Sequence, residues 1–130
     1  MDRQLTALDR TLKALSDPTR VRVLGLLRAG EVCVCHIHES LGLTQPKVSR
    51  HLAYLRRAGL VETSKRGLWV YYRLAPHADP LIQSVVDAVH HAAAHFPAPK
   101  RDATKLEQRT GCCVPAPVAP SFRKVRRMST

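Results

Sequence analysis

Two cysteines separated by one residue, Cys33 and Cys35, are the side chains in this chain best suited to chemistry. Thiolate is the softest ligand that a protein offers, so a Cys-x-Cys pair favours soft metal or metalloid ions. Side chains two residues apart point about 200° apart on an α-helix, but in the same direction in an extended segment. Both sulfurs can therefore bind one ion only if the chain is extended or unwound around residues 33–35.

Two further groups could supply a third ligand. Cys112 and Cys113 are adjacent in a C-terminal tail, which can reach the first pair at an entropy cost that grows slowly with loop length. The alternatives for this pair are an incidental pair of thiols or a second soft-ion site. His38 is the rival third ligand, and its imidazole would suit zinc or cadmium. Both cysteine pairs are awkwardly spaced for an unstrained disulfide, which favours ligands or redox sensors over structural crosslinks.

A second set of metal-binding residues occurs later in the chain. Asp87, His91 and His95 recur every four residues and so share one face of an expected helix. Two histidines at this spacing can chelate zinc, which makes the set a candidate secondary metal site. The alternative is a face that is solvated or lies at the edge of a dimer.

Basic side chains outnumber acidic ones, with 21 Lys and Arg against 10 Asp and Glu and a formal net charge of +11. Such a balance favours nucleic acid or an anionic membrane surface as a partner. The sequence has no apolar run that could span a bilayer and no signal-peptide pattern at its start, so we expect a cytoplasmic protein without a membrane partner. It has no Ser-His-Asp arrangement, paired-carboxylate pocket or Gly-rich phosphate loop, so we do not expect an enzyme.

The pattern of apolar residues predicts a mainly α fold with a small β-hairpin in one domain, residues 1–96. Asp17-Pro18 and Asp79-Pro80 are typical helix starts, because Asp caps a helix and Pro fits its first position. Residues 97–130 hold five of the nine prolines and form a basic, Cys-containing tail that we expect to be mostly disordered. The expected elements are a first helix bearing Leu5, Leu8, Leu12 and Leu15, helices starting near residues 18, 35, 45 and 80, and a hairpin with strands over 60–64 and 68–74.

The helix over residues 45–58 has the features of a DNA-reading helix. Its inward face carries Val48, Leu52 and Leu55, which leaves polar side chains for a DNA groove. Gln can bond adenine, and Arg or Lys can bond guanine, through paired hydrogen bonds. A basic hairpin tip would lie along the phosphates. The DNA-binding candidates are Gln45, Lys47, Ser49, Arg50 and His51 on the helix, and Lys65 and Arg66 at the hairpin tip.

Helix, helix, helix-turn-helix, hairpin and helix is the order of a winged helix, and four segments carry a family resemblance over roughly residues 5–95. The chain resembles the ArsR/SmtB family of metal-responsive repressors, which implies a homodimer that leaves an inverted-repeat operator when an ion binds. The segment from Glu31 to Cys35 is similar to the arsenite- and antimonite-responsive branch, but His38 stands where a third thiol is usual. The segments are Leu15-Ser16-Asp17-Pro18-Thr19-Arg20, Cys33-Val34-Cys35, Gln45-Pro46-Lys47-Val48-Ser49-Arg50-His51-Leu52 and Arg57-Ala58-Gly59-Leu60-Val61.

The resemblance thus implies a repressor released from DNA by trivalent arsenic or antimony through Cys33 and Cys35, with no permanent cofactor. The sequence does not distinguish arsenite from a methylated trivalent arsenical, which needs fewer protein thiols and could bind through Cys33 and Cys35 alone. Three alternatives stay open: a repressor for cadmium, lead or zinc that uses His38, a thiol-based redox or persulfide sensor, and a constitutive DNA-binding module. The third alternative predicts DNA binding that no ion or oxidant alters.

Overall fold

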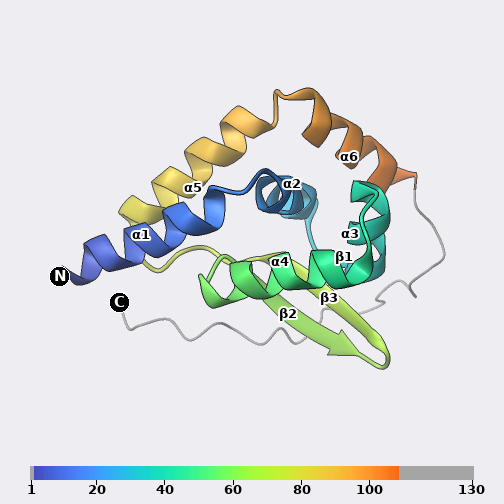
Figure 1. Cartoon of the computed structure of the whole chain (residues 1–130), viewed down its shortest axis with the longest axis horizontal. Helices are drawn as coiled ribbons and strands as arrows, with labels where there is room; N and C mark the ends of the chain where they lie inside the picture. Colours follow the sequence, from blue (N-terminus) through green and yellow to red (C-terminus); the bar gives the residue numbers. More distant parts are fainter. Residues whose placement is uncertain (1, 109–130) are drawn as a thin grey trace.

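The computed structural model describes residues 2–108; residue 1 and residues 109–130 are outside this range. The described chain forms a group of helices with a small antiparallel sheet along one side (Figure 1). This is the predicted winged helix-turn-helix, in which α3 and α4 form the helix-turn-helix and β2 and β3 form the wing. In chain order the elements are α1 (Arg3–Leu15), α2 (Pro18–Leu26), the 3₁₀ helix η1 (Leu27–Ala29), β1 (Val32–Cys33), α3 (Val34–Leu41), α4 (Gln45–Arg57), β2 (Val61–Arg66), β3 (Trp69–Leu74), α5 (Pro80–Ala93) and α6 (Pro97–Glu107).

The helix starts at Pro18 and Pro80 are confirmed, and local capping explains both. The Asp17 carboxylate accepts hydrogen bonds from the backbone N–H groups of Thr19, at 2.7 Å, and Arg20, at 3.2 Å. The Asp79 carboxylate accepts from the N–H of Leu81 at 2.9 Å. These donors belong to the first turn, where an α-helix offers no partner of its own, so the caps fix where α2 and α5 begin.

The hairpin is confirmed, but its turn lies two residues later than expected. Lys65 and Arg66 are the last residues of β2, and Gly67 and Leu68 form the turn. Gly67 has a φ of 61°, in the left-handed region that glycine adopts without a steric cost. Lys65 and Arg66 therefore belong to a strand and do not form the tip.

The sheet contains a strand, β1, that the sequence analysis did not anticipate. The sheet order is β1-β3-β2, and β1 pairs with β3 through Val32 opposite Tyr72 and Cys33 opposite Tyr71. A strand of two residues shows no periodicity, so only the partner strand reveals it.

One face of the sheet closes the helical core. Buried leucines, isoleucine and valines from α2, α3 and α4 form that core, and the inward face predicted for α4 is confirmed. Leu68 lies in the hairpin turn and is 91% exposed. The sheet residues that pack on the core are Val32, Val61, Val70, Tyr72 and Leu74.

The expectation of irregular structure from residue 97 onward is wrong for the segment up to Glu107. Pro97 and Pro99 do not prevent α6, because the first-turn N–H groups of a helix are not needed for its hydrogen bonds. The helix packs against α2 and α3 (Figure 1). Its Asp102 is 2% exposed and bonds Arg22 of α2.

At the other end of the molecule, α1 packs along α5 (Figure 1). This pair leaves three large apolar side chains in solvent: Leu5 and Leu12 on α1, 56% and 47% exposed, and Leu81 on α5, 72% exposed. Between residues 2 and 108, none of the helices combines the length and apolar character needed to cross a bilayer.

Candidate ion site and DNA-binding surface

Cys33 and Cys35 lie on either side of the point where the chain enters α3. Cys33 ends β1 and caps α3 with an extended backbone, φ −70° and ψ 143°, while Cys35 is the second residue of the helix. Cys33 is 1% exposed, and both cysteines belong to one cluster with Tyr71 and Trp69 of β3. The backbone is therefore extended at Cys33, as expected, but already helical at Val34 and Cys35.

Both sulfurs are disulfide-bonded in the structure. A thiolate binds a soft ion only after reduction, so an ion site at Cys33 and Cys35 exists in the reduced protein. Cys112 and Cys113, the proposed source of a third thiolate, lie outside the described residues. Their role stays a prediction.

The His38 side chain contacts a backbone carbonyl group. Its Nδ1 lies 3.1 Å from the carbonyl oxygen of Leu43, just beyond the C-terminal end of α3. Over residues 2–108, the structure brings no three His, Cys, Asp or Glu side chains together in a way that could hold a metal. His38 is thus not assembled with the two cysteines, and its role as a third ligand stays a prediction.

The candidate secondary metal site is also not assembled. The helix α5 ends at Ala93, so His95 lies beyond the helix that carries Asp87 and His91. The rings of His91 and His95 meet edge to face, with their centroids 5.3 Å apart. The carboxylate of Asp87 accepts a hydrogen bond from Gln83 at 2.8 Å. Zinc binding by this set stays a prediction.

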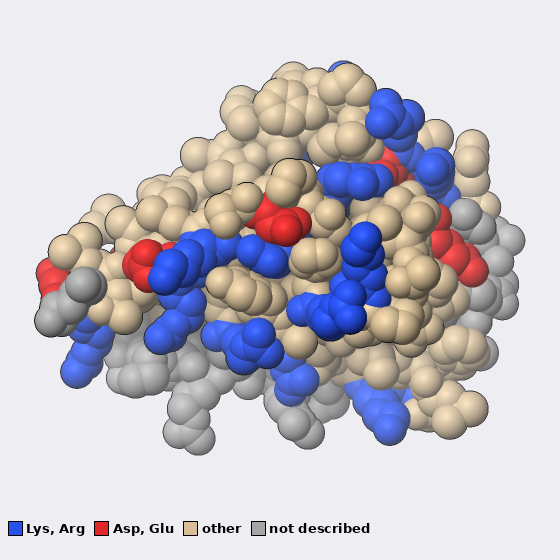
Figure 2. Space-filling view, viewed as in Figure 1, with Lys and Arg blue, Asp and Glu red and all other residues tan. Residues whose placement is uncertain are grey.

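The outer face of α4 presents the predicted DNA-binding side chains. Gln45, Lys47 and Arg50 are exposed, while Ser49 and His51 are half-buried. Lys and Arg side chains extend in a band across the face that carries α1 and α4 (Figure 2). The exposed basic residues of these two helices are Arg3, Arg10, Lys13, Lys47, Arg50, Arg56 and Arg57.

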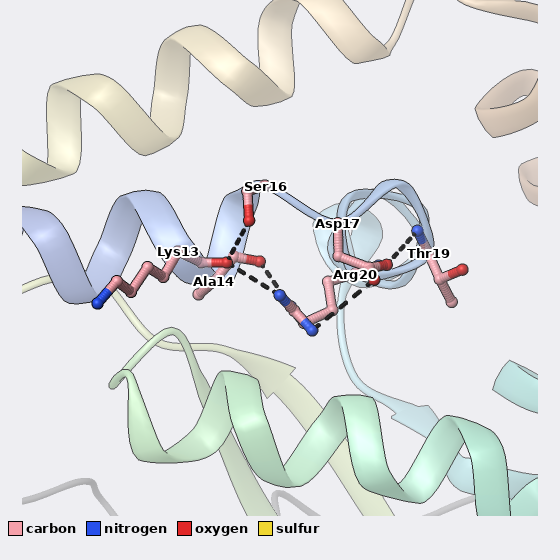
Figure 3. Close-up of polar contacts among 6 residues, drawn as sticks. All are labelled: Lys13, Ala14, Ser16, Asp17, Thr19 and Arg20. Atoms are coloured by element: carbon pink, nitrogen blue, oxygen red, sulfur yellow. Dashed lines mark hydrogen bonds and ion pairs between the residues drawn. The ribbon is translucent and has the colours of Figure 1, made fainter.

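Arg20 of α2 fixes the position of α4 against α1, a role that the sequence analysis did not assign. Its guanidinium donates to the carbonyl oxygens of Ala14, at 2.8 Å, and Lys13, at 2.9 Å, at the C-terminal end of α1 (Figure 3). The same group lies 4.1 Å from the ring centroid of Tyr54 on α4. One side chain thus joins three helices.

Arg66 is turned toward the start of β1. Its guanidinium lies 2.7 Å from the carboxylate of Glu31, the residue before β1, and 3.7 Å from the ring centroid of Tyr71. Lys65, the neighbouring wing candidate, is exposed. Lys65 is thus accessible on the wing, whereas the Arg66 guanidinium contacts Glu31 and Tyr71; DNA contact by either residue stays a prediction.

Comparison with known proteins gives a family match to a segment within the first half of the chain. Residues 17–63 match the family described as "Bacterial regulatory protein, arsR family". The Arsenic resistance transcriptional regulator ArsR1 of Pseudomonas putida is 49% identical over 81 residues, which cover 58% of this chain and 63% of that protein. The chain thus spans less than two thirds of this relative. ArsR2 of the same organism is 40% identical over 85 residues, 65% of this chain and 74% of that protein.

Solved structures give the same result. HlyU from Vibrio cholerae superposes with a TM-score of 0.63 and 29% identity, over 73% of this chain and all of that chain. Mb0332 from Mycobacterium bovis, described as a homodimeric winged helix-turn-helix DNA-binding domain, has a TM-score of 0.56 and 30% identity, over 75% of this chain and 94% of that chain. The winged helix, the position of the Cys-x-Cys pair at the start of α3 and these matches lead to one conclusion: the chain belongs to the ArsR family of bacterial regulatory proteins.

Proposed function

We propose that this protein is a dimeric transcriptional repressor that leaves its operator when trivalent arsenic or antimony binds the reduced thiols of Cys33 and Cys35. The observation that carries the proposal is the placement of this pair at the junction of β1 and α3. The helix α3 packs directly on α4, the DNA-reading helix. An ion that draws both sulfurs together acts on the first turn of α3 and so on the support of α4.

The names of the relatives support the choice of ion. ArsR1 and ArsR2 of Pseudomonas putida are both named arsenic resistance regulators. For this chain we infer arsenite coordination by Cys33, Cys35 and a thiol of the pair Cys112 and Cys113. A methylated trivalent arsenical needs only the first pair. His38 in place of the tail thiol would favour cadmium, lead or zinc.

On the DNA side, we infer that α4 enters the major groove. Its exposed Gln45, Lys47 and Arg50 have the hydrogen-bonding groups that read adenine and guanine, while Ser49 and His51 contact bases or phosphates near the edge of the groove. Lys65 on the wing contacts phosphate, which contributes affinity and salt dependence. A repressor with these contacts acts in the cytoplasm, where the DNA lies.

We infer a homodimer built on α1 and α5. The exposed Leu5, Leu12 and Leu81 form an apolar surface there, and burial of such side chains stabilises association. Two-fold symmetry then presents two α4 helices to the two halves of an inverted repeat. The coupling between ion binding and DNA binding must be reciprocal. DNA weakens ion binding by the same factor as the ion weakens DNA binding.

The test is a titration of the reduced protein, bound to a fluorescent inverted-repeat DNA from its own promoter, with arsenite, antimonite, a methylated trivalent arsenical, cadmium and zinc. Release is followed by fluorescence anisotropy for the wild type, Cys33→Ser and the double variant Cys112→Ser/Cys113→Ser. We expect arsenite to release the wild type only, and the methylated arsenical to release the tail variant as well. Release by cadmium or zinc but not arsenite would contradict the arsenic assignment.

A redox sensor is the second candidate, because Cys33 and Cys35 are disulfide-bonded in the structure. In that case oxidation, not ion binding, changes the affinity for DNA. The same DNA assay with oxidised and reduced protein, both free of metal, separates the two functions. Equal affinities in the two redox states would exclude the redox sensor.

A further inference from the structure

The strand β1, which carries Cys33, and the wing strands β2 and β3 belong to one sheet. Cys33 of β1 lies opposite Tyr71 of β3, and Tyr71 in turn lies opposite Ser64 of β2. Side chains at paired positions share a face, so these residues lie on the face opposite the helical core. Arg66 and Trp69, a paired position nearer the wing tip, share that face. A continuous row of side chains thus leads from the ion site to the wing.

Arg66 closes this row at the wing. Its guanidinium stacks 3.7 Å above the Tyr71 ring and forms the 2.7 Å ion pair with Glu31. The side chains of Arg66 and Glu31 are 22% and 26% exposed, so solvent screens this pair only in part. Within the described part of the chain, Nε and Nη1 of Arg66 are buried without a hydrogen-bond acceptor. Through the ion pair with Glu31, Arg66 links the end of β2 to the residue before β1, across the intervening strand β3.

We propose that Arg66, through Glu31 and Tyr71, transmits ion binding at Cys33 to the DNA-contacting wing. This inference rests on the proposed function. Cys33 and Tyr71 are 1% and 6% exposed and belong to one cluster, so a sulfur of Cys33 that moves to bind an ion must change its packing with the Tyr71 ring. The ring carries the Arg66 guanidinium, and the same displacement of β1 moves Glu31. The wing then shifts relative to α4, and Lys65 loses its position on the phosphates.

Arg66 is a positioning residue in this scheme, since it acts through Tyr71 and Glu31 and binds neither the ion nor the DNA. This route acts in addition to the packing of α3 on α4. It predicts that different side chains, those of Arg66 and Glu31, are needed for the coupling between ion and DNA. Variants at Arg66 and Glu31 should lower the coupling between ion and DNA and leave the ion site itself intact. The packing of α3 on α4 does not involve either residue.

The decisive quantity is the coupling ratio, defined as the operator Kd with saturating arsenite divided by the operator Kd without it. It is measured by anisotropy for the reduced full-length wild type, Glu31→Gln and Arg66→Lys. Coupling between two sites is commonly about 5- to 150-fold, and we expect both variants to lose at least about fivefold of the wild-type ratio. Their arsenite affinity without DNA, measured by calorimetry, should stay within about twofold of wild type.

Glu62→Gln is the matched control. Glu62 pairs with Arg73 at 2.9 Å on the same sheet, but this pair joins β2 to β3 and does not involve β1. The substitution removes the same charge as Glu31→Gln, so its general effect on DNA affinity is comparable and cancels in the ratio. We expect its coupling ratio to match the wild type.

Unfolding midpoints in urea show whether each variant is folded, and Arg66→Lys retains the charge if Glu31→Gln proves unstable. Wild-type coupling ratios in both folded variants would overturn the proposal and leave α3 as the route. An equal loss in Glu62→Gln would also overturn it, because any weakening of the sheet would then suffice. Absence of arsenite-induced release in the wild type is a separate result, which contradicts the proposed function itself.

Discussion

Arg22 of α2 and Asp102 of α6 form a bidentate salt bridge, with each carboxylate oxygen 2.8 Å from a guanidinium nitrogen. The hydrogen bonds from Arg22 to Asp102 raise the pKa of Arg22 above its ordinary value. The same guanidinium also lies 3.4 Å from the carbonyl oxygen of Leu41 at the end of α3. Arg22 thereby fixes α6 against the helix that begins at the ion site.

We predict that Asp102→Asn lowers the free energy of unfolding by about 3 kcal/mol, because loss of one partner leaves a largely buried charge without compensation. Urea unfolding at pH 7 measures the effect. Asp9→Asn is the control, since Asp9 pairs with Lys13 at 3.1 Å in solvent, where ion pairs contribute at most about 1 kcal/mol. Equal losses in the two variants would show that burial of Asp102 has no special weight.

Asp102→Asn should also change the binding affinity for arsenite without changing that for a methylated arsenical. Cys112 follows Glu107, the last residue of α6, by five positions, a segment that spans at most about 17 Å. A firmly docked α6 keeps the local concentration of the tail thiols high, and a loosened α6 lowers it. We expect weaker arsenite binding and unchanged binding of a methylated arsenical, both measured by calorimetry on the folded, reduced variant. A parallel loss for both ligands would contradict a contribution from the tail.

Arg20 should be sensitive even to a conservative change. Arg20→Lys retains the charge but loses the planar group that donates to two carbonyls of α1 and stacks on Tyr54. We expect a loss of about 1 to 2 kcal/mol in unfolding free energy and weaker operator binding, because α4 is no longer held against α1. Arg57→Lys is the control, since that guanidinium is exposed and lies 5.7 Å from the Tyr54 ring centroid. Urea unfolding and anisotropy measure both.

Asp17 gives a pH dependence of known sign. Burial acts to raise the pKa of Asp17, but hydrogen bonds from the N–H groups of Arg20 and Thr19 outweigh it, so the pKa lies below its ordinary value of 3.8. A carboxylate with a lowered pKa stabilises the fold above its ordinary pKa and loses this effect as the pH falls through the folded value. The stability difference between wild type and Asp17→Asn, from urea midpoints at pH 7 to 2, should therefore shrink below about pH 4. A difference that stays constant down to pH 2 would contradict the cap's charge contribution.

Trp69 should report ion binding directly. It is the single tryptophan of the chain and packs in the cluster with Cys33, Cys35 and Tyr71. Sulfur atoms contact aromatic rings favourably, so a change at the thiols alters the surroundings of the indole. Arsenite added to the reduced, DNA-free protein should change the Trp emission with saturation, and Cys33→Ser should abolish the change. His91→Gln leaves the cluster intact and should respond like the wild type.

The sequence predicted those elements whose signals are local. Asp17-Pro18 and Asp79-Pro80 carry their own capping groups, and Val70, Tyr72 and Leu74 recur at every second position of β3, so both were found. The strand β1 and the helix α6 depend on remote partners. Cys33 needs Tyr71 opposite it, and Asp102 needs Arg22, which lies 80 residues away in the chain. No local pattern reveals such pairs.

The candidate site divides in the same way. The requirement for an extended backbone at the cysteine pair follows from side-chain geometry alone, but the structure meets it only at Cys33, since Val34 and Cys35 belong to α3. The orientation of Arg66 does not follow from its position in a basic hairpin, because a free wing arginine and one paired with Glu31 have the same sequence neighbours. The contacts of Arg20 with α1 also could not be predicted from the sequence. Its partners there are the backbone carbonyls of Lys13 and Ala14, and every residue type carries such a group.

The shortness of β1 also limits how this protein can vary. Val32 contributes to the core, and Cys33 lies on the opposite face of the sheet, so a shift of one residue in the pairing would exchange a thiol for a core valine. The two residues between η1 and β1, Gly30 and Glu31, set that pairing. A single inserted residue there would leave each cysteine in the chain and yet turn the first thiol away from Tyr71. The length of this connection is therefore as much a part of the sensor as the sulfur atoms.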